Sequence, residues 1–460
     1  MSRLVVVSNR VAPVAEDQPS AGGLAVGVHG ALKQSGGIWF GWSGEIVDAP
    51  PETPTLYQQD SVGYATIGLS RRDYDQYYRG FSNGTLWPTF HYRTDLSRYD
   101  RKEYAGYLRV NAWLVEKLKP ILRPDDLLWV HDYHLLPFAR MCREAGIANR
   151  IGFFLHIPFP VEPVLRTVPP HRELTEAMCA YDLLGFQTDD DCTAFSDYAR
   201  RQLGAVPQAP GVLAVGRRRV RVGTYPIGVL PDEIQEQSQT HSNSRQILNL
   251  KQGLHQRRLI MSVDRLDYSK GLVERFQAFE RLLEMAPAHR GKVSFIQIAP
   301  PSRSDVEMYR NIRRQLESAA GRINGRWTDL TWTPIRYINK NYDRLMLMSL
   351  FRASQIGYVT PLRDGMNLVA KEYVAAQPAD DPGVLVLSEF AGAARELGDG
   401  ALLVNPYDTD GMAQALGRAL IMPVEERKER HQQMMRRLRE NDLDRWRDRF
   451  LADLRGDEFA

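Results

Sequence analysis

The chain has 460 residues, 43% of them hydrophobic, which is enough for two large domains with separate cores. Its 59 basic and 56 acidic residues are interleaved and leave a net charge of +3, which argues against the concentrated basic face of a nucleic-acid-binding protein. The three cysteines have no paired spacing, which indicates a reducing compartment.

Signals for secretion or membrane insertion are not expected either. Near the start, only residues 4–7 form a continuous apolar run, and this run is too short for a signal peptide. No apolar run approaches the ~20 residues that a membrane-spanning helix requires. We therefore expect a soluble, cytoplasmic protein.

Strand-length apolar runs alternate with helix-length patterns along most of the chain. Helix patterns such as residues 108–118 and 272–283 lie between the runs. This alternation is typical of parallel sheets with helices on both faces, and two such series predict an α/β protein with two doubly wound domains. The expected strands cover residues 4–7, 127–130, 151–155, 183–186, 259–263, 293–298, 356–359, 384–387 and 401–404.

A domain boundary is expected after residue 228. The sequence then turns polar, and residues 235–249 are crowded with Gln, Ser and Asn before the second series begins. Near the C-terminus, Trp446, Phe450 and Leu454 have the i, i+4, i+8 spacing of one apolar helix stripe. This spacing predicts a packed terminal helix whose opposite face is solvated.

The first candidate ligand-binding turns follow the N-terminal strand. Arg10 ends a polar turn, and a loop with Gly22 and Gly23 precedes the helix-like residues 25–33. Paired glycines let the backbone approach a ligand closely, and a following helix start favours a phosphate, although a plain turn is the alternative. The chain contains no G-x-G-x-x-G and no Walker A motif, so dinucleotide and P-loop binding have no support.

Polar side chains also follow two neighbouring strands of the first half. His131, Asp132 and His134 follow one expected strand, and His156 follows the next. The carboxyl ends of such strands face the crevice in which open α/β sheets bind ligands. The spacing fits no zinc template, so we expect no metal there. The three aspartates at residues 189–191 are expected to cap and start a helix.

In the second half, Arg265 and Lys270 flank one strand-to-helix turn. Two converging cations suit a diphosphate. The alternative is that they form surface salt bridges with Asp264 and Asp267. Arg303 lies a few residues past another expected strand, at the same edge of the sheet.

The densest group of polar side chains surrounds the turn at residues 360–365. Pro361 ends the preceding strand, Gly365 permits a tight backbone path, and a helix is expected from Met366. The start of that helix suits a phosphate or a sugar hydroxyl, and Glu372 could accept two ribose hydroxyls. The alternative is that this stretch only connects a strand to a helix.

Seven long motifs occur in order from the N-terminus: RLVVVSNR, SAGGLAVG, FSNGTLWP, HDYHLLPF, GFFLHIPFP, DRLDYSKGL and TPLRDGMNLVAKEY. Together they resemble the trehalose-6-phosphate synthases of glycosyltransferase family 20, and the resemblance covers nearly the whole chain. It implies two Rossmann-like domains that face a cleft, the GT-B arrangement. Residues 1–228 would bind the acceptor and residues 229–435 the nucleotide sugar, while a helix in residues 436–460 would cross back to the first domain.

The resemblance also implies the reaction. Such enzymes transfer glucose from a nucleotide sugar, usually UDP-glucose, to C1 of glucose 6-phosphate with retention, giving α,α-trehalose 6-phosphate and UDP. The mechanism would be front-face, with a leaving-phosphate oxygen taking the proton of the acceptor hydroxyl and no cofactor or metal required. Since charge builds on the leaving diphosphate, fixed cations there would stabilise the transition state most. No carboxylate pair stands out for a double displacement.

For the acceptor, the resemblance implies that Arg10, Tyr78 and Arg303 hold the phosphate. Asp132 would bind hydroxyls near the reacting centre, and Trp87 would shape the pocket and favour one anomer.

For the donor, the resemblance implies that Gly22 and Gly23 close over the diphosphate, that Arg265 and Lys270 neutralise it, and that His156 touches the glucose. The residues at the reacting centre would thus be Asp132, His156, Arg265 and Lys270. The remaining donor contacts would come from Tyr342 near the uracil, Asp364 and the backbone of Gly365, Met366, Asn367, Leu368 and Val369 at the glucose and phosphate, and Glu372 at the ribose.

Three alternatives remain beside this interpretation: a relative with another acceptor such as glycerol 3-phosphate, a pseudo-glycosyltransferase that couples cyclitols, and a non-catalytic regulatory subunit. The intact acceptor and donor positions argue against all three. The donor positions would serve UDP-, ADP- or GDP-glucose equally. The resemblance further implies a homo-oligomer, a dimer or tetramer, and a separate trehalose-6-phosphate phosphatase that acts on the product.

Overall fold

The structure is a computed structural model and describes residues 2–11, 28, 30, 32–33, 36–302 and 307–456. The chain divides into two compact units. The first unit comprises Met1–Pro226 together with Asp444–Ala460, and the second comprises Ile227–Leu443. The sequence-based divisions were placed after residues 228 and 435, and the second of these positions falls inside helix α17 (Val424–Glu440).

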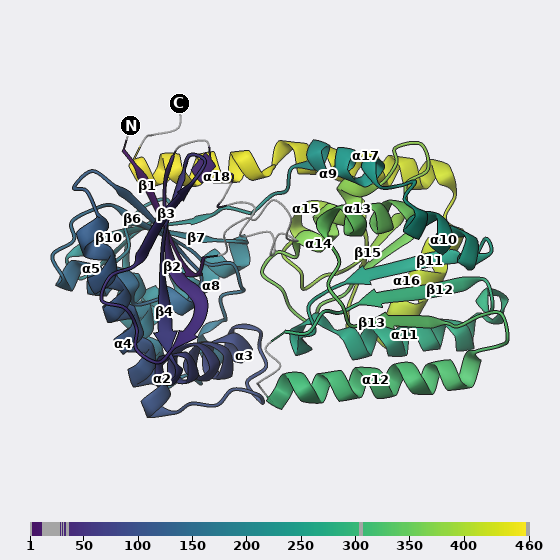
Figure 1. Cartoon of the computed structure of the whole chain (residues 1–460), viewed down its shortest axis with the longest axis horizontal. Coiled ribbons are helices and arrows are strands. Elements are labelled where there is room, and N and C mark those ends of the chain that lie inside the picture. The colour runs from purple at the N-terminus through teal and green to yellow at the C-terminus, as the bar shows by residue number, and fades with distance from the viewer. Residues whose placement is uncertain are drawn as a thin grey trace. The chain divides into compact units, whose positions relative to one another are not determined.

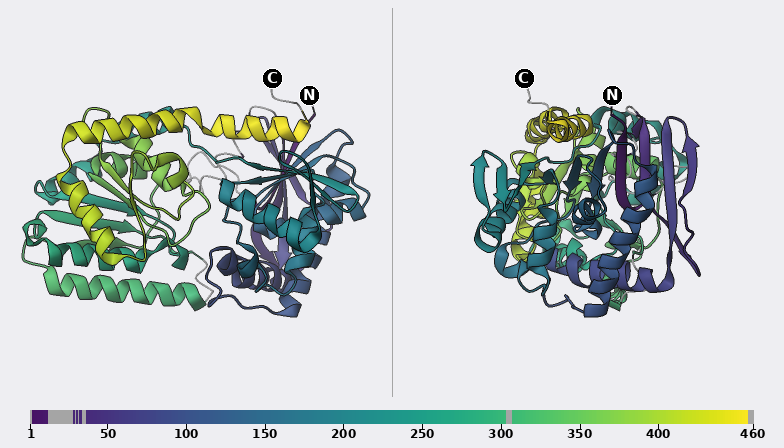
Figure 2. Two further views of the ribbon diagram at one scale, coloured as in Figure 1. Left: turned by 180° about the vertical axis from the view of Figure 1, so that it is seen from behind. Right: turned by 90° about the vertical axis from the view of Figure 1, so that its left-hand side faces the viewer.

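The described strands of the first unit form a single sheet in the order β3-β4-β2-β1-β5-β6-β7-β10-β9-β8 (Figures 1 and 2). The strands from β4 through β10 in this order pair in parallel, whereas β3, β9 and β8 pair antiparallel at the two edges. Strand bounds are β1 Leu4–Arg10, β2 Gly37–Val47, β3 Thr55–Gln59, β4 Val62–Ser70, β5 Leu127–His131, β6 Ile151–Phe154, β7 Leu183–Phe186, β8 Val206–Ala209, β9 Val212–Val215 and β10 Arg218–Thr224.

The helices of the first unit begin where capping residues favour them. Asp100 accepts hydrogen bonds from the backbone N–H groups of Lys102 and Glu103 at the start of α4. At the start of α8 the cap is Thr188, which accepts from the Asp191 N–H, and not one of the three aspartates expected to cap this helix; the aspartates do occupy its first turn, as expected. The described helical segments are α2 Arg71–Asp73, the π-helix η1 Tyr74–Leu86, α3 Trp87–Phe90, α4 Arg101–Leu118, η2 Lys119–Ile121, η3 Tyr133–Leu135, α5 Phe138–Glu144, α6 Glu162–Leu165, α7 His171–Met178, α8 Asp189–Leu203 and α18 Leu443–Arg455.

Helix α18 belongs to the first unit through its apolar stripe. Trp446, Phe450 and Leu454 are all buried, which confirms the sequence prediction. The Phe450 ring fills the space above two glycines, since a Cβ atom at Gly152 or Gly185 would lie 2.8 Å or 2.7 Å from it. The glycines therefore allow the last helix to pack closely against strands β6 and β7.

The described strands of the second unit form a parallel sheet in the order β13-β12-β11-β14-β15-β16 (Figure 1). These strands are largely buried, as expected for a sheet covered on both faces. Strand bounds are β11 Arg258–Val263, β12 Val293–Ile298, β13 Ile335–Ile338, β14 Ile356–Val359, β15 Val384–Ser388 and β16 Leu402–Val404.

Helices cover both faces of this second sheet (Figure 1). On one face, α11 packs against α12 and α16, and on the other face α9 packs against α13, α14 and α17. The described helical segments are α9 Pro231–Thr240, α10 Arg245–Leu254, η4 Tyr268–Lys270, α11 Leu272–Met285, η5 Pro287–His289, α12 Glu307–Trp327, α13 Arg344–Ala353, α14 Leu368–Ala376, α15 Ala394–Leu397, α16 Thr409–Ile421 and α17.

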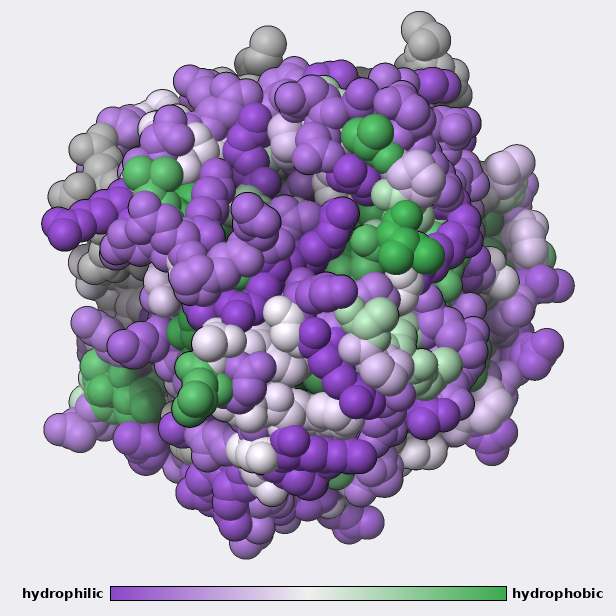
Figure 3. All heavy atoms as spheres, turned by 90° about the vertical axis from the view of Figure 1, so that its right-hand side faces the viewer, coloured by the Kyte–Doolittle hydropathy of each residue, from purple (hydrophilic) through white to green (hydrophobic). Residues whose placement is uncertain are grey.

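Every strand expected from the sequence is present, and two series of parallel strands with covering helices confirm the predicted α/β architecture. The sequence did not predict the strands β2 to β4, β8 to β10 and β13, nor the π-helix η1. Within the described ranges, no helix combines the length and the apolar character needed to cross a bilayer. The face drawn in Figure 3 is mainly hydrophilic, with hydrophobic residues in small groups.

Candidate active site

The candidate site residues fall into two groups, one in each unit, and we describe each group by itself. Three predicted residues, Gly22, Gly23 and Arg303, lie outside the described residues.

Arg10 stands at the carboxyl end of β1, where the sequence placed it. The β1 backbone is held there by Ser8, whose hydroxyl donates to the Arg10 carbonyl (3.0 Å) and accepts from the Trp39 indole (2.8 Å). The Arg10 guanidinium lies over Gly44, because a Cβ atom there would come within 2.8 Å of its Nε atom. Gly44 also has a φ of +91°, so two independent features favour glycine beside this cation.

Tyr78 lies on the π-helix η1 within an aromatic cluster of Trp42, Tyr74, Tyr78 and His134. Its ring is stacked on His134 (centroids 5.7 Å apart, planes at 10°) and lies 5.5 Å from the Trp42 ring. Tyr74 completes the cluster at 5.4 Å from Tyr78. The cluster orients Tyr78 from two sides, so its position depends on β2 and on the segment after β5 as well as on its own helix.

Trp87 begins α3 and is only 4% exposed. Its ring packs 4.1 Å from His91 and 5.5 Å from Tyr133. The Tyr133 hydroxyl in turn donates to the Asn83 side chain (2.7 Å). The Trp87 ring is therefore fixed by packing between its own helical segment and the segment after β5.

Asp132, the first residue after β5, has an unusual backbone conformation. Its φ is +77° and its ψ is 166°, a region that glycine tolerates and other residues adopt only under strain. The neighbouring sheet strand enforces this conformation, because the Asp132 N–H donates to the Phe154 carbonyl (2.9 Å). One carboxylate oxygen accepts from the His156 backbone N–H (3.4 Å). This backbone conformation places the Asp132 carboxyl group at the carboxyl ends of the neighbouring strands β5 and β6.

His131 and His156 form a direct imidazole pair at that same end. The Nδ1 atom of His131 and the Nε2 atom of His156 are 3.0 Å apart, and His131 is fully buried. Burial lowers the pKa of His156 to about 3 and that of His131 well below its ordinary value, and the neighbouring His156 lowers the pKa of His131 further. Both rings are therefore neutral at pH 7, so His156 can donate or accept a hydrogen bond but does not act as a charged group.

The carboxyl ends of strands β11 and β14 form the second group. Lys270, at the end of η4, pairs with Asp364: its Nζ atom lies 2.5 Å from Oδ2, and both side chains are nearly buried. Asp267 instead caps η4 and accepts from the Tyr309 hydroxyl (3.0 Å). The salt bridges with Asp264 and Asp267 that the sequence left open for Lys270 are thus replaced by one with Asp364.

Asp264 has a different partner, the fully buried Arg275 of α11. The guanidinium donates to the Asp264 carboxylate (2.8 Å), the Thr360 hydroxyl (3.1 Å) and the Lys270 carbonyl (3.0 Å). Burial raises the pKa of Asp264, and Arg275 opposes this shift. Arg275 therefore links the turn after β11 to the turn after β14. The sequence analysis did not identify this residue.

The loop between β14 and α14 is held by backbone hydrogen bonds to the segment after β15. The N–H of Asp364 donates to the Phe390 carbonyl (3.1 Å), and the N–H of Gly392 donates to the Asp364 carbonyl (3.2 Å). Asn367, with a φ of +78°, caps α14 through Ala370 and donates to Asp364 (3.0 Å). Helix α14 thus begins at Leu368, two residues later than expected, and Gly365 to Asn367 belong to the loop.

Glu372 lies in α14 and pairs with Arg344, the first residue of α13 (2.8 Å). Tyr342 is half-buried and immediately precedes Asp343, the residue that caps α13. Lys371 is directed elsewhere, because it is buried, pairs with Glu396 and donates to the Ile227 carbonyl (2.8 Å). The polar cluster seen in the sequence therefore separates into a candidate binding group and a structural pair.

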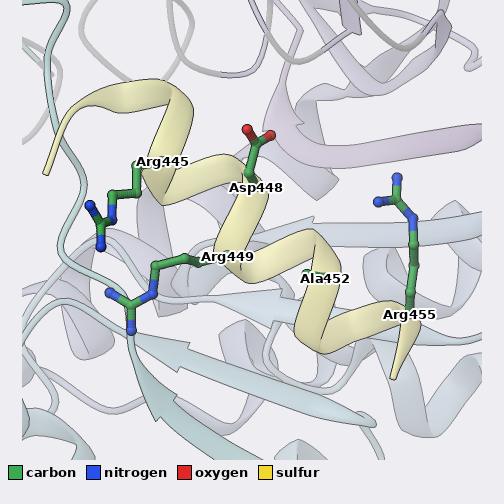
Figure 4. Close-up of a pocket in the computed structure, with 5 residues that line it drawn as sticks. All are labelled: Arg445, Asp448, Arg449, Ala452 and Arg455. Carbon is green, nitrogen blue, oxygen red and sulfur yellow. The ribbon is translucent and has the colours of Figure 1, made fainter. Parts of the chain in front are cut away.

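A metal site and a surface cavity are other kinds of site that the chain could carry. Among the described residues, no three His, Cys, Asp or Glu side chains come together as metal ligands would. A surface cavity lies along α18 and is lined by Arg445, Asp448, Arg449, Ala452 and Arg455 (Figure 4). In this view Arg445 and Arg449 project to the same side of the helix. None of the residues predicted from the motifs lines that cavity.

Comparisons with known proteins agree on one family. A family model described as "Glycosyltransferase family 20" matches residues 3–456. The chain is 55% identical over 457 residues to the trehalose-6-phosphate synthase of Cronobacter sakazakii, covering 99% of this chain and 95% of the relative.

Solved structures give the same result. A UDP-forming α,α-trehalose-phosphate synthase from Burkholderia xenovorans, in complex with glucose-6-phosphate, is 60% identical with a TM-score of 0.95, covering 99% of this chain and 100% of the other. An E. coli structure bound with UDP-2-fluoro glucose is 51% identical with a TM-score of 0.95, covering 98% and 99%.

Proposed function

The chain belongs to glycosyltransferase family 20, and we propose that it transfers glucose from UDP-glucose to glucose 6-phosphate, forming α,α-trehalose 6-phosphate and UDP. The family match and the similar proteins of known structure confirm the family, the enzyme class and the GT-B fold class expected from the motifs. The observation that carries the proposal is that relatives at 60% and 51% identity bind glucose-6-phosphate and a UDP-glucose analogue.

For the first unit we propose an acceptor role. Arg10 and Tyr78, with Arg303, hold the phosphate of glucose 6-phosphate. Asp132 accepts from acceptor hydroxyls near the reacting carbon, and the buried Trp87 limits the room for the other anomer. The support is that Asp132 and Tyr78 are held in place by neighbours and that the Arg10 guanidinium lies against Gly44 at the end of β1, as a binding site for a small sugar phosphate requires.

For the second unit we propose a donor role. Arg265 and Lys270 neutralise the diphosphate together with Gly22 and Gly23, and Asp364 with the backbone of Gly365 to Val369 holds the glucose. Glu372 accepts the ribose hydroxyls, Tyr342 lies beside the uracil, and His156 of the first unit contacts the glucose as a neutral group. Support comes from the strand ends on which the described residues lie, where α/β sheets bind nucleotides.

The chemistry we propose is front-face transfer with retention. As the glycosidic bond of the donor breaks, negative charge grows on the leaving diphosphate, and cations already fixed there stabilise the transition state more than the ground state. A phosphate oxygen takes the proton of the acceptor hydroxyl as that hydroxyl attacks on the same face. The protein itself supplies no nucleophile in this scheme.

Release of nucleoside diphosphate tests the proposal. Purified protein with glucose 6-phosphate would receive UDP-, ADP- or GDP-glucose in parallel. We expect turnover that requires both substrates and is fastest with UDP-glucose. Arg10→Ala should raise the KM for glucose 6-phosphate, whereas Arg93→Ala, which removes a surface ion pair with Asp95, should not. No turnover with any donor, from a folded protein that binds UDP, would contradict the assignment.

The cellular compartment, the assembly state and the next enzyme are also proposed from the resemblance. We propose that it acts in the cytoplasm as a homo-oligomer, a dimer or tetramer, and that a separate phosphatase converts the product to trehalose. Light scattering during size-exclusion chromatography tests the assembly, and a single mass near 52.4 kDa would contradict it.

A further inference from the structure

We propose that Arg344 is a positioning residue that orients the Glu372 carboxylate for the ribose, and that this pair makes the donor site depend on the 2′- and 3′-hydroxyls of the nucleotide. The inference rests on the proposed function, because it takes Glu372 as the ribose acceptor. Arg344 was not identified by the sequence analysis.

The geometry supports a fixed carboxylate. The Nη1 atom of Arg344 donates to Oε1 of Glu372 (2.8 Å), and its Nε atom donates to the Gln237 side chain (3.2 Å). The side chains of Arg344 and Glu372 are 26% and 13% exposed. The guanidinium is therefore anchored at two points, on α9 and α14, and cannot rotate without losing one of them.

A carboxylate held in this way is suited to a vicinal diol. Each oxygen can accept two hydrogen bonds, so one bond from Arg344 to Oε1 leaves acceptor positions on both oxygens. A charge-assisted bond to a planar guanidinium also fixes the plane of the carboxylate. Because the rotamer is fixed before the ligand arrives, less conformational entropy is lost when the ribose binds.

The position of Arg344 along the chain also points to the nucleoside. Tyr342, proposed to lie beside the uracil, precedes Arg344 by two residues. Between them Asp343 caps α13, accepting from the Met346 N–H (2.7 Å). One capped helix start thus carries both the residue for the base and the residue that acts on Glu372.

The competing explanation is that Arg344 only ties three helices together. Arg352 on the same helix provides a matched control for that role. Its guanidinium donates to the Ser238 hydroxyl of α9 (3.5 Å) and to the Ala376 carbonyl of α14 (3.4 Å). Arg352 therefore links the same three helices without contacting Glu372.

The experiment measures binding of UDP and of 2′,3′-dideoxy-UDP by calorimetry. The proteins are the wild type, Arg344→Ala, Glu372→Ala, the double variant and Arg352→Ala. We expect Arg344→Ala to weaken UDP binding roughly tenfold and to leave dideoxy-UDP binding unchanged. The double variant should bind UDP no more weakly than Glu372→Ala, because Arg344 acts through Glu372. Arg352→Ala should leave both affinities unchanged.

Three results would overturn the inference: an equal loss for both nucleotides in Arg344→Ala, no loss for either, or a wild type that does not distinguish them. An equal loss of affinity for both nucleotides would mean that Arg344 acts on the diphosphate or the base, or that it stabilises the fold. Turnover of UDP-glucose with glucose 6-phosphate by the wild type is measured separately. A failure of the ribose inference is thereby distinguished from a failure of the proposed reaction.

Discussion

The Nζ atom of Lys270 lies 2.5 Å from Oδ2 of Asp364, although the two residues are 94 positions apart in the chain. The proposed roles of the pair differ: Lys270 for the diphosphate and Asp364 for the glucose. A diphosphate that binds Lys270 therefore meets a carboxylate that already holds one of the three ammonium N–H groups, and the two anions compete for the charge of one cation.

This competition gives the first prediction. Asp364→Asn removes the competing charge, so UDP should bind several-fold more tightly, while kcat/KM for UDP-glucose should fall because the glucose loses a carboxylate acceptor. Calorimetry with UDP and steady-state kinetics measure the two effects. Asp381→Asn, at an exposed carboxylate that pairs with the nearly buried Arg427, serves as the control. Weaker UDP binding in Asp364→Asn would show that the carboxylate does not compete.

The imidazole pair predicts a pH dependence of stability. The unfolded chain protonates both histidines near their ordinary pKa of about 6.5, whereas burial keeps the folded rings neutral down to about pH 3 for His156. Between these values the unfolded state binds more protons, so the free energy of unfolding falls as the pH falls.

The check is urea unfolding of the wild type and of His131→Phe/His156→Asn between pH 4 and pH 7. The slope of unfolding free energy against pH should be shallower in the double variant by up to about 1.4 kcal/mol per pH unit for each histidine. Equal slopes would mean that the two rings are protonated in the folded protein as well.

The backbone of Asp132 leads to the third prediction, which separates strain from chemistry. Asp132→Ala and Asp132→Gly both remove the proposed acceptor contact, so both should lower kcat/KM. Only glycine adopts a φ of +77° with a ψ of 166° without strain. The glycine variant should therefore be more stable than the alanine variant by about 1 kcal/mol. Thermal unfolding of the two variants measures the difference, and a more stable alanine variant would refute it.

Arg275 supports the fourth prediction. Replacing it with Met leaves the Asp264 carboxylate buried without its guanidinium, which should cost about 3–5 kcal/mol of unfolding free energy. Arg281→Ala on the same helix, at an exposed pair with Asp410, should change stability little. Urea denaturation compares the two, and a similar small loss in both would show that the buried network is dispensable.

The sequence by itself determined the buried strands that carry the candidate residues and the strand ends at which these residues lie. Continuous apolar runs marked the buried parallel strands, and Asp132, His156, Lys270 and Asp364 each follow one of them. Because the parallel strands of one sheet end at the same edge, the order of runs and polar turns was sufficient to predict that Asp132 and His156 lie together in the first unit, and Lys270 and Asp364 in the second. The burial of Trp446, Phe450 and Leu454 was also predicted correctly, because apolar residues at helical spacing lie on one face of a helix.

Only the tertiary structure decided which charges pair. Asp267 is a near neighbour of Lys270 in sequence, yet the ion pair forms with Asp364, and Arg275 and Arg344 find partners on other elements. Hydrophobic spacing tells which face of an element is buried but carries no information about the charge that another element brings to it. The partner of a charged side chain depends on how sheet order and loop geometry bring distant segments together, and these are properties of the folded chain.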